Sequence, residues 1–368
     1  MIRVCGLLIV LALTACAPGP PEPRFHAEGM PEKLSAWGML DVGGGRLTLA
    51  SGVEPYELNT PLFTDHAGKL RTVWMPKGTP AGYAPDAAFD FPVGAVITKT
   101  FFYPRAAGEA VAPGDDLSLG QTAEGLDLSR TRLVETRVLV RRQDGWVAFP
   151  YVWNAAQTEA TLKRTGQAIP MTLVRAGRED RFVYQVPNVN QCVGCHGTDH
   201  ATKKLQPIGL KARHLNREVT LGGQTRNQLD HLALVGYLKG LPSDRPRAAD
   251  WRDEAAPLDA RARAWLDINC AHCHSATGPA DTSGLYLDPS TPPGPALGLC
   301  KPPIAAGQGT GGFRVDILPG KPEESILIFR TGSTDPGAMM PELGRALAHD
   351  EGLALLRRWI AAMPGDCG

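Results

Sequence analysis

The chain has 368 residues, and its 38 basic and 38 acidic side chains give a formal net charge of zero. This balance argues against nucleic acid or an anionic membrane surface as a partner, because both attract basic proteins. The length fits two or three domains of about 100 to 200 residues each. With 41 glycines, 32 prolines and only 7% aromatic residues, the composition predicts turns and ordered loops rather than a helical bundle.

The first residues have the features of a secretory signal, expected to cover residues 1–15. Arg3 precedes an apolar run over residues 4–13 that is too short to span a bilayer. The sequence Leu13-Thr14-Ala15-Cys16 resembles a bacterial lipobox, which implies cleavage before Cys16 and lipid on that residue. Plain cleavage after Ala17 is the alternative. Since Ala17 is not the aspartate that retains lipoproteins at the inner membrane, the expected location is the periplasmic side of the outer membrane, with acyl chains as anchor.

The next two segments are expected to be a tether and a β domain. Residues 16–35 are rich in proline and predict an extended tether. Within residues 36–186, the segments 134–140 and 146–153 flank Asp144-Gly145 and predict a hairpin. Further strands are predicted at residues 71–74, 96–103 and 181–186. We therefore expect a mostly β, sandwich-like domain.

Two short motifs carry the chemistry of the chain. Cys192-Val193-Gly194-Cys195-His196 and Cys270-Ala271-His272-Cys273-His274 both have the Cys-x-x-Cys-His spacing that attaches haem covalently. Two thiols one helical turn apart can bond to the haem vinyl groups, and the histidine that follows can ligate the iron. A zinc site or a redox dithiol would not explain a histidine at the same position twice. The motifs predict two haem c groups, held by Cys192, Cys195, Cys270 and Cys273, with His196 and His274 on the irons.

Residues 187–250 are expected to form the first haem region, which is short for a separate cytochrome domain and should pack against the β domain. No methionine lies between Cys195 and the second motif, so a methionine ligand would have to come from upstream, as Met171 or Met75 would. The preferred candidate for the second ligand of this iron is His214, with His231, His200 and His66 as alternatives. The iron could also be five-coordinate, and an open iron face could bind peroxide.

Residues 251–368 are expected to form a second cytochrome c domain. Apolar residues at helical spacing lead from Leu258 into the second motif, and another amphipathic helix is predicted to begin near residues 349–351. Between them, Met340 is the preferred second ligand of this iron, and Met339 is the reserve. Histidine and methionine ligation would raise the reduction potential.

Two cysteines remain after these assignments. Cys5 leaves with the signal, Cys16 is lipidated and the motifs use four, so Cys300 and Cys367 are predicted to form a disulfide in an oxidising compartment.

Several stretches resemble a family of diheme c-type cytochromes, lipoproteins of Gram-negative bacteria. They are residues 56–63 (YELNTPLF), 91–94 (FPVG), 151–154 (YVWN), 266–270 (LDINC) and 339–344 (MMPELG). The resemblance implies two covalent haems and an extracytoplasmic location, and it assigns iron ligation to His196 and His274. It implies no substrate.

The expected fold is thus multidomain, with a mostly β, sandwich-like N-terminal domain followed by α-helical cytochrome c haem-binding regions. The expected function is electron transfer by a membrane-anchored periplasmic diheme cytochrome, between partners such as another cytochrome, a dehydrogenase or a terminal oxidase. The alternative is a peroxidase-like diheme enzyme with one open iron. No catalytic side chain is assigned, and no nucleic acid is expected.

Overall fold

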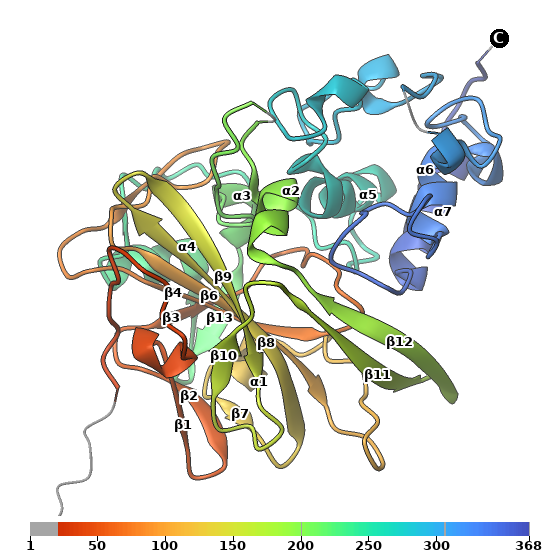
Figure 1. Ribbon diagram of the computed structural model, residues 1–368. Helices are drawn as coiled ribbons and strands as arrows, with labels where there is room; N and C mark the ends of the chain where they lie inside the picture. The colour runs from red at the N-terminus through yellow and green to blue at the C-terminus, as the bar shows by residue number, and fades with distance from the viewer. Residues whose placement is uncertain (1–20, 200, 305–306, 368) are drawn as a thin grey trace, which may run out of the picture.

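The computed structural model describes residues 21–199, 201–304 and 307–367. The expected signal, the lipidation site Cys16 and the candidate ligand His200 lie outside these ranges. Strands account for 28% of the chain and helices for 21%. Figure 1 shows the strands gathered in the N-terminal half and the longer helices at the opposite end of the molecule. No helix in the described ranges is long and apolar enough to span a membrane.

The largest element is a six-stranded antiparallel sheet with the order β10-β9-β8-β6-β4-β3. Its strands are β3 (Glu54–Tyr56), β4 (Gly68–Trp74), β6 (Val96–Pro104), β8 (Thr131–Arg142), β9 (Gly145–Trp153) and β10 (Ala160–Leu162). The predicted hairpin is confirmed as β8 and β9, with Arg142 opposite Gly145. Gly145 has φ of 139°, a conformation that glycine adopts without the steric cost of a side chain.

The two faces of this sheet are covered by different parts of the chain. One face packs on Trp37, Leu40 and Leu47 from the N-terminal segment. The opposite face contributes Ile97 and Leu139 to a core that also contains residues 210–238 and Ile268. The segment that follows the first Cys-x-x-Cys-His motif therefore lies directly on the main sheet.

The remaining sheets are small. β1 (Leu40–Gly43), β2 (Arg46–Leu49) and β7 (Leu126–Asp127) form a three-stranded sheet, and three further sheets in the described residues have two strands each. These pairings are β11 (Gln167–Arg175) with β12 (Arg178–Val186), β13 (Glu218–Leu221) with β14 (Gln224–Asn227), and β5 (Ala81–Gly82) with β15 (Leu238–Lys239). The expected sandwich is wrong, because the second face of the main sheet is covered mostly by loops and short helices. The alternation of residue types along a strand shows which residues share a face of the sheet. It does not reveal which part of the chain covers that face.

The helices before the second motif are short. They are η1 (Leu34–Trp37), α1 (Leu119–Thr122), η2 (Val189–Gln191), α2 (Cys192–His196), α3 (Ala212–Leu215) and α4 (Gln228–Leu234). From there to residue 367 the structure has α5 (Leu258–Leu266), η3 (Asp267–Ala271), η4 (Asp281–Ser283), η5 (Pro295–Leu297), η6 (Gly307–Thr310), η7 (Pro322–Glu324), α6 (Ile326–Gly332) and α7 (Asp350–Ala361). The predicted helices near Leu258 and residue 350 are confirmed as α5 and α7, which share a core with α6.

The expected α-helical cytochrome c regions are also wrong. After residue 187 only α5 and α7 exceed seven residues in the described ranges, and the first motif occupies a helix of five residues. The described residues also contain no cluster of three or more His, Cys, Asp or Glu side chains that could hold a metal ion. Glycines and prolines between residues 275 and 345 interrupt the backbone too often for longer helices. The protein is mostly β, with several small sheets.

Candidate functional site

The two Cys-x-x-Cys-His motifs, far apart in the sequence, lie against each other. The thiol of Cys273 lies 3.1 Å from the carbonyl oxygen of Gly194 and donates to it. The thiols of Cys195 and Cys273 also share a hydrogen bond, which lowers the pKa of Cys195 and raises that of Cys273. Figure 1 shows α2 between the main sheet and α5. The four motif cysteines form no disulfide with one another.

The first motif lines a cavity of about 1110 Å³. Cys192, Cys195 and His196 lie on one wall, and Lys99 and Arg137 from the main sheet lie on another. The C-terminal part of the chain contributes further lining residues: Met340, Pro341, Leu343, Gly344, Arg345 and His349.

The second motif lines a separate cavity of about 670 Å³ with Cys270 and His274. Its other walls include Lys301, Asp316 and Met340. Met340 and Thr331 line both cavities. The two cavities are therefore neighbours with common walls.

Both motif histidines are hydrogen-bonded through Nδ1. In His196, Nδ1 lies 2.8 Å from the carbonyl oxygen of Gln206, and since a carbonyl only accepts, Nδ1 carries the proton. In His274, Nδ1 lies 3.2 Å from the Ser283 hydroxyl, which itself donates to the carbonyl of Ala280. Each ring thus keeps a lone pair on Nε2, as an iron ligand requires.

Burial favours the neutral form of both rings. It lowers the pKa of His196 and of His274 to about 4, because a charged imidazole loses its hydration in these sites. At neutral pH both histidines are uncharged, which is the form that binds metals.

The structure places Met340 where a thioether can face the second motif. Its backbone N–H donates to the carbonyl of Arg330 at 2.9 Å, and its own carbonyl accepts from Arg345 at 3.0 Å. The reserve candidate Met339 is buried, with 7% of its surface exposed, and it lines neither of the two cavities. Arg345 thus fixes the loop that carries Met340.

The histidines predicted as further ligands of the first iron lie elsewhere. His214 is buried in α3 with Nε2 3.4 Å from Asp267, and His231 contacts Glu54 at 2.8 Å. Neither they nor His66 line the cavity that contains His196. Sequence reasoning supplied no placement for them, because their surroundings depend on long-range packing.

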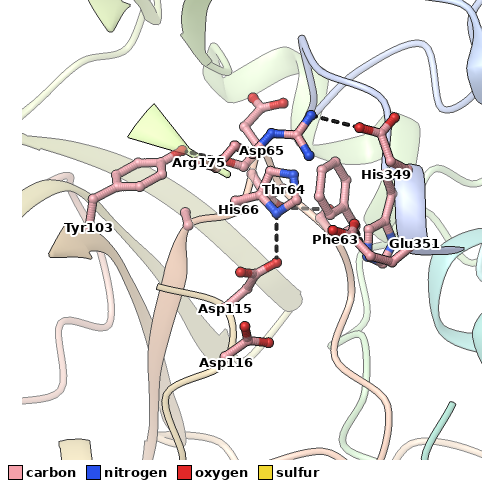
Figure 2. Close-up of polar contacts among 12 residues, drawn as sticks. Phe63, Thr64, Asp65, His66, Tyr103, Asp115, Asp116, Arg175, His349 and Glu351 are labelled. Atoms are coloured by element: carbon pink, nitrogen blue, oxygen red, sulfur yellow. Dashed lines mark hydrogen bonds and ion pairs between the residues drawn. The ribbon is translucent and has the colours of Figure 1, made fainter. Parts of the chain in front are cut away.

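His66 belongs to a buried polar cluster beside the cavity (Figure 2). Its Nδ1 lies 3.1 Å from Asp115, and its Nε2 has no hydrogen-bond partner among the described residues. Next to it, Asp65 accepts the backbone N–H groups of Ala346 and Leu347 at 2.7 Å each. Burial raises the pKa of Asp65 to about 6. The cluster joins the β part of the chain to the loop that follows Met340.

Sequence analysis did not single out His349, although this residue lines the first cavity. Its ring stacks on Phe63 with centroids 4.3 Å apart, as Figure 2 shows. The indole N–H of Trp265 donates to its Nδ1 at 3.0 Å. This bond places the ring proton on Nε2, so His349 offers no lone pair to an iron there. No motif marks this residue in the sequence.

Taken together, the residues of both motifs fit a covalent haem. The first cavity brings together Cys192, Cys195 and His196, and the second brings together Cys270 and His274. In each, the imidazole is neutral with a free Nε2 lone pair and the walls are mostly apolar. Cys273 lines neither cavity, and its thiol contacts Gly194 instead. Comparisons with family models, with curated proteins and with solved structures found no match to this chain.

Proposed function

We propose that this protein is a diheme electron-transfer protein with one haem c at each motif. The observation that carries the proposal is the direct contact between the motifs at Cys273 and Gly194, together with two cavities that share Met340 and Thr331. Two redox centres held in neighbouring cavities can exchange electrons without a mobile carrier. When bound, haem iron supplies one-electron redox chemistry at a potential set by its ligands and surroundings.

The chain's own residues have defined tasks in this proposal. Cys192 and Cys195 would hold the first haem through thioether bonds, with His196 as ligand. Cys270 and Cys273 would hold the second, with His274 as ligand and Met340 as the thioether ligand in the same cavity. The Gln206 carbonyl and the Ser283 hydroxyl orient the two imidazoles and increase their basicity.

Location and partners follow from the N-terminal sequence. Lipid on Cys16 would anchor the protein at the periplasmic side of the outer membrane, where haem c is attached. Its partners would then be periplasmic redox proteins, such as a cytochrome, a dehydrogenase or a terminal oxidase. Residues 21–35, between the lipid site and the main sheet, lie within the predicted tether.

One observation favours a second candidate function, a peroxidase-like diheme enzyme. None of the described histidines predicted as second ligand of the first iron lines the first cavity, and His349 presents a protonated Nε2. An iron without a sixth ligand can bind a small molecule such as peroxide.

The deciding experiment is spectroscopy of the mature protein, produced together with a haem-attachment system. The pyridine haemochrome assay should give two covalent haems per chain. Ferric and dithionite-reduced spectra are then recorded with and without carbon monoxide. Two haems that do not respond to carbon monoxide support electron transfer, and a shift in half of the haem supports the enzyme. Absence of covalent haem would refute both proposals.

A further inference from the structure

A row of three cations crosses the main sheet beside the first motif. Arg71 on β4 lies opposite Lys99 on β6, and Lys99 lies opposite Arg137 on β8. Directly opposed residues on neighbouring strands project from the same face of a sheet, and like charges there repel each other. The same face bears the cavity of the first motif, so the repulsion lies in a partly enclosed space.

Among the residues that the structure describes, only Arg137 of this row forms an ion pair with a carboxylate. Arg137 makes two hydrogen bonds with Glu135, at 2.5 and 3.0 Å. Glu135 is fully buried and also accepts from Tyr184 at 2.7 Å. Glu135 thus pairs directly with Arg137 and Tyr184. It acts on Lys99, and Glu57 acts on Arg71, only through longer-range electrostatic attraction.

Arg71 is the most unusual member. Only 6% of its surface is exposed, yet its guanidinium has no hydrogen bond or ion pair with any residue that the structure describes. Burial lowers its pKa, which expresses the cost of holding an unpaired charge away from water. Arg71 lines two adjoining cavities, one that it shares with Lys99 and Arg137 and one that it shares with Glu57 and Asp115.

Lys99 has no anionic partner within the described residues either. Its ammonium lies 5.3 Å from the centre of the Phe101 ring, a contact that compensates only part of the lost hydration. The nearby Arg137 guanidinium lies over the same ring at 4.5 Å. Lys99, Arg137 and His196 all line both the first cavity and a smaller adjoining one that Arg71 also lines.

We propose that Arg71, Lys99 and Arg137 form a binding site for a carboxylate-bearing ligand where the first cavity meets the smaller cavity that all three residues line. This carboxylate has two candidate sources. The first is the propionate groups of a haem attached at Cys192 and Cys195, and for this source the inference rests on the proposed function. The other source is a free organic carboxylate that enters the adjoining cavity. Arginine and lysine are the side chains that bind carboxylates most strongly.

The test uses Lys99→Gln and Arg71→Gln in the full-length protein after haem attachment. Arg137 is left unchanged, because its removal would leave the buried Glu135 unpaired. The matched controls are Lys239→Gln and Arg181→Gln, which remove the same side-chain types from exposed positions. Haem content, both midpoint potentials, the propionate bands of the resonance Raman spectrum and the Tm are measured for each variant.

Propionate binding predicts changes at one haem only. Loss of a nearby cation makes reduction of that haem less favourable by about tenfold, which corresponds to about 59 mV for a one-electron couple. The propionate bands should move in both test variants and in neither control, and the Tm should fall. Without a bound anion, the same substitutions should leave the Tm unchanged or raise it, because they relieve repulsion.

A free carboxylate is tested with succinate, against sodium chloride at equal ionic strength. If the row binds a free carboxylate, succinate raises the Tm of the wild type and not of the test variants. If neither the Raman bands nor the succinate response depends on Lys99 and Arg71, the site does not exist. If the chain carries no haem, the proposed function fails, while the succinate titration still decides whether the row binds a carboxylate.

Discussion

The thiol of Cys273 donates a hydrogen bond to the carbonyl oxygen of Gly194, over a distance of 3.1 Å and a sequence separation of 79 residues. This contact places Cys273, the second cysteine of the second motif, against Gly194 at the centre of the first motif. Because the two motifs belong to different parts of the fold, their contact joins the segment on the main sheet to the C-terminal helices. Four predictions follow from this arrangement and from the residues around it.

The cysteine pairs should each account for one haem. In the double variant Cys192→Ala/Cys195→Ala we expect one covalent haem per chain, at the second motif. In Cys270→Ala/Cys273→Ala we expect one covalent haem per chain, at the first motif. Mass spectrometry of the denatured protein counts the attached haems. A double variant that loses both haems would show that one site is needed to build the other, and one that keeps both would refute attachment at that motif.

Met340 should differ from its neighbour Met339. Met340→Ala should remove the near-infrared absorption typical of methionine-ligated ferric haem and lower one midpoint potential, since a thioether ligand raises it. Met339→Ala should keep both signatures and reduce stability by roughly 2–5 kcal/mol, the usual cost of truncating a buried methionine. Near-infrared spectra and urea unfolding separate the two results. Equal spectra in Met340→Ala and the wild type would contradict the assignment.

Removal of the disulfide should destabilise the C-terminal part. Cys300 and Cys367 form a disulfide with their Cα atoms 5.3 Å apart, and it closes a loop of 67 residues. In the chain-entropy model a loop of this length contributes about 4 kcal/mol. We expect a loss of this order in Cys300→Ser/Cys367→Ser by urea unfolding. The control is Thr334→Ala, an exposed hydroxyl change within the loop that leaves it closed, and an equal loss in that control would assign the effect to general sensitivity of the region.

Asp65 should make stability depend on pH. Burial raises its pKa in the folded protein from 3.8 to about 6, so between these values the folded state holds more protons than the unfolded state. The free energy of unfolding therefore decreases as pH rises from about 4 to about 6, by up to about 3 kcal/mol from this group. Asp65→Asn should flatten this dependence in urea unfolding at pH 4, 5, 6 and 7.

The exposed Asp116, with 81% of its side chain accessible, is the matched control for Asp65. Asp116→Asn should retain the pH dependence of the wild type. Identical slopes in Asp65→Asn and the wild type would show that Asp65 does not titrate in this range.

Local sequence patterns predicted individual elements better than their assembly. The Asp144-Gly145 turn and the alternation on either side of it were enough to predict the β8–β9 hairpin. Helical spacing likewise predicted α5 and α7, because each has a continuous apolar stripe. The covering of the sheet was not predictable, since Ile97 and Leu139 look the same in sequence whether a second sheet or residues 210–238 pack on them.

The candidate site shows the same division. The motif spacing identifies Cys192, His196 and their counterparts without any structure. By contrast, Arg71 and Lys99 lie side by side only because of the register between β4 and β6. His349 lines the first cavity only because α7 packs against α5. A lone histidine or a lone arginine carries no sequence signal for such a role.

The contact between Cys195 and Cys273 has a consequence for biosynthesis. An oxidant that joins Cys300 to Cys367 would encounter, in the same folded chain, two other thiols that share a hydrogen bond. A crosslink there would consume one cysteine of each motif and prevent attachment at both. We therefore expect the steps of maturation to occur in a fixed order. A reductant would keep the motif thiols reduced until each has been bonded to haem. Non-reducing peptide mapping of chains made without haem supply would reveal the misplaced bond as a linked pair of motif peptides.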